Sequence, residues 1–141
     1  MTEHQLYEQI ARYLQMKYSN VIYRFDLAAD LKLTMGQAAK HKRLHPKRGY
    51  PDLFIAQSAP RCIDGSWKYE YYGLFLELKA EGHSPFKKDG SLKKDEHLEE
   101  QWEMLQELEK RGYKARFATG FNEAKKLIED YLGGTNGEVE F

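Results

Sequence analysis

The sequence contains a single cysteine, Cys62, so it can form neither an internal disulfide nor a zinc site built from several thiolates. It also lacks a long hydrophobic run: a membrane-spanning helix needs roughly 20 apolar residues, whereas the apolar stretch 73–76 already ends at Glu77. The first residues lack the basic and then apolar pattern of a secretory signal. These absences predict a protein of the reducing cytoplasm that has no membrane partner.

The chain has no net charge, because 22 basic residues balance 22 acidic ones, but the two signs are segregated along it. Residues 31–51 contain no acid, whereas residues 96–109 contain six glutamates and no lysine or arginine. A neutral sum therefore does not exclude a polyanionic partner, since the positions of the charges decide what binds. The length of 141 residues suits one domain, expected over residues 1–132 and followed by a flexible tail over 133–141.

Hydrophobic periodicity and turn residues predict an α/β fold in which helices flank a small mixed β-sheet. Helices are expected over residues 3–17, from Lys94 or Asp95 to Arg111, and from a cap at Asn122 to Gly133, with a short helix or a loop over 34–45. Strands are expected over residues 21–27, 52–56, 69–80 and 114–119, with a hairpin turn over 57–68. The apolar stripe of the long helix is expected to consist of Leu98, Trp102, Leu105 and Leu108.

The strand 69–80 combines an apolar face with charged residues. Alternate side chains of a strand share a face, so the three leucines within 74–78 should face the core while Glu77 and Lys79 point the other way. A charge in an otherwise apolar strand is costly unless it is paired or binds a metal. Asp52 begins the preceding strand, and if the two strands are neighbours its carboxylate comes close to that of Glu77.

Two close carboxylates repel each other, and a divalent cation relieves the repulsion. Oxygen ligands with an open water position are typical of Mg²⁺ or Mn²⁺ sites, and Lys79 could orient or deprotonate a metal-bound water. Such a set suits phosphodiester hydrolysis. The alternative is an ordinary surface ion pair between Glu77 and Lys79 on an edge strand, with Asp52 in a turn.

Three segments occur in a specific order: Gly49-Tyr50-Pro51-Asp52-Leu53, then Leu76-Glu77-Leu78-Lys79-Ala80, then a helix that contains Gln101 and ends at Gly112. In order and spacing they resemble the VRR-NUC branch of the PD-(D/E)XK nucleases, and the opening Thr2-Glu3-His4-Gln5 is similar to that family's first helix. The resemblance spans residues 2–132. It implies a restriction-endonuclease-like minimal core of order α-β-β-β-α-β and cleavage of DNA with Mg²⁺ or Mn²⁺.

The resemblance also implies roles for individual residues of the two strands. Asp52 and Glu77 match the metal ligands, with the backbone carbonyl of Leu78 as a third ligand, and Lys79 matches the catalytic lysine. The chain departs from the family pattern in the insertion-like segment 57–68, which puts the geometry between the two strands in question.

Two helices add further residues to the implied site. Gln101 matches the helix glutamine that supports the site, and Glu3 matches the acid of the first helix, with Glu8 as an alternative because the sequence leaves the helix register open. Standalone members of this branch, typical of phages and bacteria, are similar to Holliday-junction resolvases and act as homodimers.

The sequence thus predicts a metal-dependent, structure-selective endonuclease that cuts four-way DNA junctions as a homodimer, in the cytoplasm of a bacterium or a phage-infected cell. It needs no nucleotide cofactor. A nicking or flap-type nuclease and an inactive DNA-binding or adaptor module of the same fold are the alternatives.

The acid-free segment before Asp52 is a candidate DNA-binding surface, because cations there would contact phosphates beside the metal. Its candidate residues are Lys40, Lys42, Arg43, Lys47 and Arg48. A solvated basic face is the alternative. The four lysines of the loop 81–94 could hold a second duplex arm or remain solvated.

The remaining aromatic and histidine residues are assigned to more ordinary places. Ten tyrosines are more than so small a domain can bury, and aromatic residues are enriched at interfaces, so Tyr7 with Tyr13, or the cluster Tyr69, Tyr71 and Tyr72, are candidates for a dimer surface. The five histidines show no metal-ligand spacing and are expected at the surface.

Overall fold

A mixed four-stranded sheet forms the centre of the computed structural model, which describes residues 1–26 and 32–133. In spatial order its strands are β1 (Tyr23–Phe25), β2 (Leu53–Ile55), β5 (Leu74–Lys79) and β6 (Lys114–Thr119). β2 is antiparallel to both β1 and β5, whereas β6 lies parallel to β5. The parallel pair needs a crossover connection, which here contains helix α3 (Glu96–Lys110).

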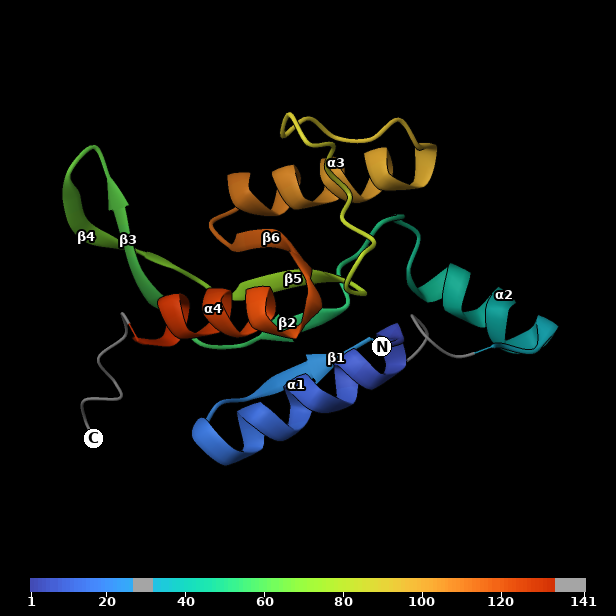
Figure 1. Cartoon of the computed structure of the whole chain (residues 1–141), viewed down its shortest axis with the longest axis horizontal. Coiled ribbons are helices and arrows are strands. Elements are labelled where there is room, and N and C mark those ends of the chain that lie inside the picture. The colour runs from blue at the N-terminus through green and yellow to red at the C-terminus, as the bar shows by residue number, and fades with distance from the viewer. Residues whose placement is uncertain (27–31, 134–141) are drawn as a thin grey trace.

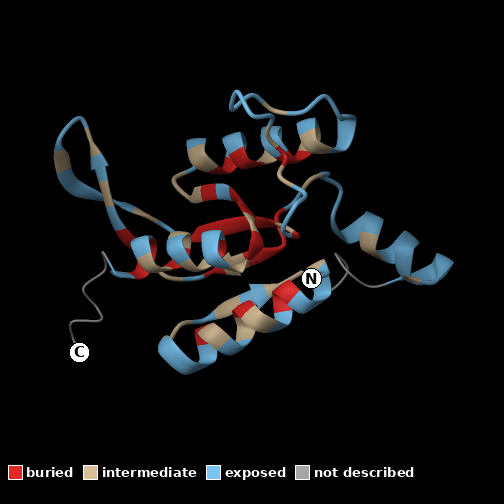
Figure 2. Ribbon diagram, in the orientation of Figure 1, coloured by how far each residue is buried: buried red, intermediate tan, exposed pale blue. Residues whose placement is uncertain are grey.

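Helices cover both faces of the sheet (Figure 1). Helices α1 (Glu3–Lys17) and α4 (Gly120–Gly133) pack on one face, where the buried cluster is mainly aliphatic and includes the leucines of β5. Helix α3 packs on the other face over an aromatic cluster that includes Phe75 and Phe117. Figure 2 accordingly shows the buried residues in the central strands and on the inner sides of the helices.

The sequence signals at the helix starts explain why these elements begin where they do. Thr2 caps α1: its side chain accepts a hydrogen bond from the backbone N–H of Gln5, and the Gln5 side chain accepts one from the backbone N–H of Thr2. Asp95 caps α3 by accepting from the backbone N–H of Leu98. The expected bounds 3–17 and 114–119 are confirmed.

The segment 57–80 differs from the expectation of one turn and one long strand. It contains a separate hairpin, β3 (Ala59–Ile63) and β4 (Ser66–Tyr71), and β5 begins only at Leu74. The hairpin turns at Asp64 and Gly65, which both have positive φ, the backbone that an Asp-Gly pair favours in tight hairpins. The interpretation of 57–68 as a mere turn and of 69–80 as one strand is therefore wrong.

Two expectations about helices are also wrong. Helix α4 begins at Gly120 directly after β6 rather than at a cap on Asn122, and the Glu123 carboxylate accepts from the backbone N–H of Thr119. On α3, Trp102 is 38% exposed, whereas its neighbour Gln101 is only 6% exposed. The buried stripe of α3 therefore includes a polar residue that the apolar pattern does not indicate.

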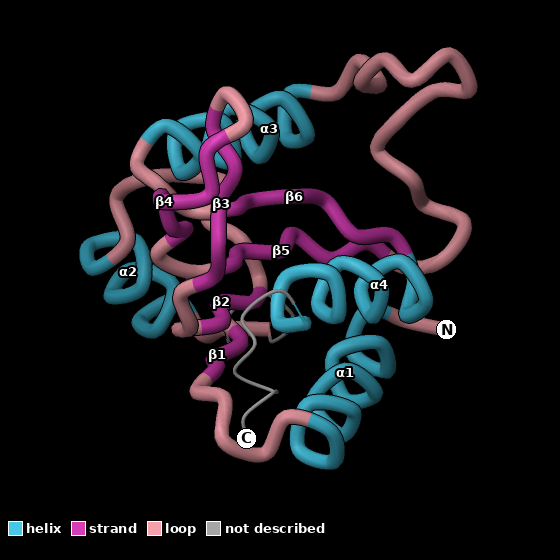
Figure 3. The backbone as a smooth tube through the Cα atoms, turned by 90° about the vertical axis from the view of Figure 1, so that its left-hand side faces the viewer, coloured by secondary structure: helices cyan, strands magenta, loops and turns pink. Residues whose placement is uncertain are grey.

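Two elements project from opposite ends of the molecule (Figures 1 and 3). One is the β3–β4 hairpin, and the other is helix α2 (Met35–Leu44), which has no buried residue. Within residues 1–26 and 32–133, no helix is long and apolar enough to cross a membrane. Apart from Gly133, which ends α4, the expected tail lies outside the described residues.

Candidate active site

The sheet brings Asp52 and Glu77 together at neighbouring ends of β2 and β5. The register pairs Leu53 with Leu76, so Asp52 lies across from Glu77. Both carboxylates are almost fully buried, and the backbone N–H of Leu78 donates a 2.8 Å hydrogen bond to Asp52 Oδ2. An exposed ion pair beside a turn residue, the alternative for this segment, is therefore wrong.

Gly49 lets the chain before Asp52 approach α3 closely. Its φ is +79°, and a Cβ atom there would lie 2.7 Å from the backbone oxygen of Glu100 and 3.1 Å from Gln101 Cα. Only a residue without a side chain allows this contact. The close approach places the β2 carboxylate beside the helix that carries Gln101.

Gln101 links the two charged residues of β5. Its Oε1 accepts a 2.8 Å hydrogen bond from Lys79 Nζ, and its Nε2 donates a 3.1 Å bond to Glu77 Oε2. Lys79 Nζ itself lies 3.9 Å from Glu77 Oε2, and the Lys79 side chain is only 12% exposed. Because an ammonium group can only donate, it fixes which end of the Gln101 amide faces each partner.

This orientation also explains the contact with His97 on the preceding turn of α3. Gln101 Nε2 lies 3.1 Å from His97 Nε2. Since the amide nitrogen donates, His97 Nε2 accepts, which places the imidazole proton on Nδ1. His97 is exposed, as expected of the histidines, but its contact with Gln101 was not predicted, although a spacing of four residues on a helix was the available signal.

The carboxylates carry more negative charge than their surroundings balance. Burial, followed by the charge of Asp52, raises the pKa of Glu77 to about 10, and burial also raises the pKa of Asp52. Glu77 Oε1 is buried and has no hydrogen-bond partner among the described residues. A buried acceptor of this kind is costly unless something compensates it.

Of the two candidate acids of the first helix, Glu3 is the one whose charge acts on Glu77. The charge of Glu3 contributes to the raised pKa of Glu77, whereas Glu8 is exposed and lies 3.2 Å from His4. Tyr7, one turn after Glu3, is buried, and burial and then Asp52 raise the pKa of its hydroxyl. Sequence analysis missed Tyr7 as part of the site, although its spacing of four from Glu3 places both on one helix face.

The donor set fits a hard divalent cation. Among the described residues, no group of three or more His, Cys, Asp or Glu side chains could hold a metal ion, so the side-chain ligands that the site offers are the two carboxylates. Mg²⁺ keeps several water ligands and needs few from the protein. A divalent cation would relieve both the unpartnered Glu77 Oε1 and the repulsion that contributes to the raised pKa of Glu77.

The cations of the acid-free segment are exposed on α2 and on the chain that leads from it to Asp52. Lys40, Lys42 and Arg43 are exposed on α2, and Lys47 and Arg48 follow it, with Arg48 at 3.7 Å from Glu100. His45, at the end of α2, lines a hollow of about 320 Å³ that also has Asp52 on its wall. The basic segment thus leads to the carboxylates.

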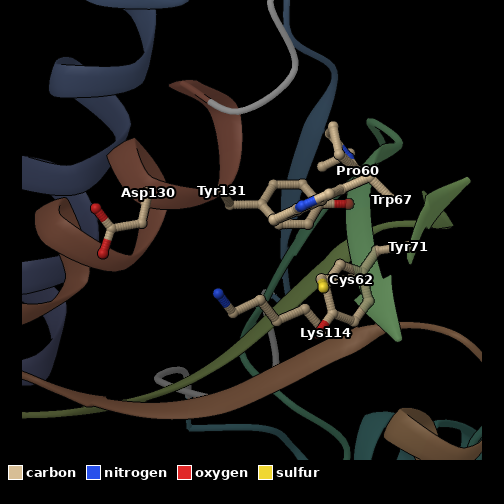
Figure 4. A pocket seen from close by; sticks show the side chains of 8 residues that line it. Pro60, Cys62, Trp67, Tyr71, Lys114, Asp130 and Tyr131 are labelled. Carbon is tan, nitrogen blue, oxygen red and sulfur yellow. The ribbon is translucent and has the colours of Figure 1, made fainter. Parts of the chain in front are cut away.

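A second hollow, of about 690 Å³, lies between the β3–β4 hairpin and α4 (Figure 4). Aromatic side chains line it, with Lys114 and Asp130 at one side, and burial lowers the pKa of Lys114. None of the site residues described above lines this hollow. The chemistry of the molecule therefore concentrates at Asp52 and Glu77.

Leaving aside α2, α4 and the hairpin, the elements follow the order α-β-β-β-α-β of the restriction-endonuclease-like minimal core, and this is the class of fold that the chain has. A solved structure titled VRR_NUC domain protein is similar, with a TM-score of 0.65 and 23% identity over 95% of this chain and 90% of that chain. No protein-family model and no curated protein matches the sequence. The likeness establishes the fold, which is that of a VRR-NUC domain, as the sequence predicted.

Proposed function

We propose that this protein is a metal-dependent DNA endonuclease that hydrolyses phosphodiester bonds. The observation that carries the proposal is the buried set of Asp52, Glu77 and Lys79, joined through Gln101 on a VRR-NUC fold. A structural ion pair needs neither a second buried carboxylate nor an unpartnered oxygen on Glu77. Burial of these charged groups lowers the stability of the fold, and a catalytic role accounts for their presence.

Asp52, Glu77 and the backbone carbonyl of Leu78 would hold Mg²⁺ or Mn²⁺. When bound, the cation would supply a Lewis acid for the phosphate and a water of lowered pKa. Lys79, held by Gln101, would orient or take a proton from the attacking water. Glu3 and Tyr7 lie close enough to the carboxylates to contribute to the electrostatics of the site.

The basic segment supports DNA as the substrate. Lysine and arginine contacts to phosphates bind DNA without reading its sequence, and each lost contact lowers the salt dependence of affinity by about one unit of slope. Glutamate substitutions at Lys42, Arg43 and Lys47 should weaken binding equally for all sequences and flatten that slope. Unchanged affinity and slope would show that these cations form only a solvated face.

We further propose a homodimer that acts on four-way junctions, because symmetric cleavage needs two sites and each chain has one. Closed two-fold dimers are the commonest soluble oligomers. Of the aromatic residues expected at the dimer surface, Tyr7 is buried in the core, whereas Tyr69 and Tyr72 near the hairpin are 44% and 66% exposed. The hairpin is therefore the better candidate surface.

The decisive experiment incubates the protein with a four-way junction, a linear duplex and a single strand, each with Mg²⁺, Mn²⁺ or EDTA. We expect symmetric nicks in the junction that require the metal, and light scattering at twice the chain mass. A monomer that only nicks DNA or cuts flaps would support the nuclease proposal and contradict the resolvase proposal. Binding without cleavage under every condition would support the inactive DNA-binding module instead.

A further inference from the structure

The hollow beside Asp52 contains a cation that neither the metal site nor the basic helix includes. Its wall consists of Arg24, Asp26, His45, Tyr50, Pro51, Asp52 and Phe54. Helix α3 packs over β6, so it covers the β5–β6 half of this sheet face and leaves the hollow on the β1–β2 half. Arg24 pairs with Phe54 across β1 and β2, so the two side chains share the face that also holds Asp52.

Arg24 is placed to bind an anion. It is exposed and has no carboxylate within ion-pair distance among the described residues, whereas Arg48 and Arg111 each have one. The planar guanidinium of arginine matches two phosphate oxygens at once. The neighbouring acid, Asp26, has its Oδ1 4.0 Å from His41 Nε2.

Two aromatic side chains, Tyr50 and Phe54, also line the hollow. The Tyr50 ring packs edge-on against Phe75, with 5.5 Å between centroids, and 47% of the Tyr50 residue is exposed. Arg24 and Asp26 line the same hollow as Tyr50. A cation and an aromatic ring that line the same hollow suit the phosphate and the sugar of one nucleotide.

We propose that this hollow binds the phosphodiester next to the scissile one, with Arg24 on its oxygens and its sugar against Tyr50. The proposal rests on the proposed function. Because Arg24 pairs with Phe54, it lies diagonally from Asp52 on this sheet face, at about 7–8 Å. That separation suits a phosphate one nucleotide along the strand from the phosphate at Asp52. The DNA strand would thus run from the carboxylates across β1 towards α2.

The test replaces single phosphates of the cleaved strand by uncharged methylphosphonates on either side of the cut. The wild-type protein should cut one of these two substrates about 10-fold more slowly than unmodified DNA, since a hydrogen-bonded charge contact is lost. Arg24→Ala should cut unmodified DNA about 10-fold more slowly than the wild type does, and the sensitive methylphosphonate should not slow this variant further. Arg24→Lys should fall between them, and Arg111→Ala, which removes an exposed arginine at the end of α3, should behave as wild type.

Affinities measured in EDTA on the same substrates separate this inference from the proposed function. Binding without cleavage would contradict the proposed nuclease activity. The Arg24 contact could still be tested, because the affinities of the wild type and of Arg24→Ala for the modified and unmodified DNA should then show the same pattern. If Arg24→Ala keeps the full methylphosphonate penalty, another residue holds that phosphate and the inference is wrong. The inference is also wrong if Arg24→Ala abolishes the effect of removing the adjacent base but not the effect of the uncharged phosphate, because the hollow would then bind a base.

Discussion

On one side of β5, Leu74, Leu76 and Leu78 pack into the aliphatic core beneath α1 and α4. On the other side, Glu77 and Lys79 are nearly as buried but depend on Gln101 for their hydrogen bonds. Burial of the leucines stabilises the fold directly, whereas burial of the charges opposes it. One six-residue strand therefore separates the residues that hold the protein together from those that we propose carry its chemistry.

The largest effect should come from the polar face. Lys79→Ala should lower the single-turnover cleavage rate by roughly 10²–10⁴-fold, the contribution typical of a positioned acid or base. Junction affinity in EDTA and the melting temperature should change little, because Lys79 does not fill the core. Cleavage at nearly the wild-type rate would remove Lys79 from the mechanism.

The matched change on the apolar face should have the opposite pattern. Leu76→Ala should lower the free energy of unfolding by about 2–5 kcal/mol, since it leaves a cavity in a closely packed core. Urea denaturation measures this loss, and cleavage per folded molecule should stay close to wild type at low temperature. A large loss of activity in the folded variant would mean that the two faces are not separable.

The carboxylates should account for metal affinity. Asp52→Asn keeps an oxygen that can accept from the Leu78 N–H, and Glu77→Gln keeps the size of the side chain, yet each removes one negative charge. Calorimetric titration with Mn²⁺ should therefore show binding in the wild type and none in either variant. Glu8→Gln on α1 is the control, and equal affinity in all four proteins would exclude a metal site here.

The raised pKa of Glu77 predicts how stability depends on pH without metal. The unfolded chain loses this proton as the pH rises past 4.5, whereas the folded protein keeps it up to about 10. The stabilisation is therefore complete at low pH and is lost as the pH rises between these values, by at most about 1.4 kcal/mol per pH unit. Melting curves in EDTA should show this fall, and Glu77→Gln or added Mn²⁺ should reduce it.

The elements with a strong local signal were predictable from the sequence. The capping box at Thr2 defines the start of α1, and strict alternation assigned the two faces of β5 correctly. A hairpin turn was expected over 57–68 and the chain does turn at Asp64-Gly65, but the strands β3 and β4 that flank this turn were not predicted. The reason is that the apolar pattern runs from Tyr69 into β5 without an obvious break.

Local pattern and family resemblance together predicted Asp52, Glu77 and Lys79, whereas the resemblance alone predicted Gln101. The sequence pointed to Asp52, Glu77 and Lys79, and the fold brings them together. Gln101 rather than Trp102 is buried on α3, where it accepts a hydrogen bond from Lys79. Because Lys79 lies 22 positions earlier in the chain, the local pattern of the helix does not indicate this burial. Arg24 is isolated in the sequence, so only the pairing of β1 with β2 relates it to Asp52.

The smallest effect that we predict tests how Gln101 is held between the two charges of β5. His97 accepts a hydrogen bond from the same amide nitrogen that binds Glu77, so its loss should let the amide turn and weaken its hold on Lys79. A hydrogen bond of this kind contributes about 0.5–1.5 kcal/mol, so His97→Ala should slow single-turnover cleavage by about 2–10-fold with unchanged junction affinity. His97→Gln, which restores an acceptor, should recover part of the rate, and Glu96→Ala is the neighbouring control. Nitrogen NMR should find the neutral His97 ring protonated on Nδ1; protonation on Nε2, or an equal loss in the Glu96 variant, would rule out this positioning role.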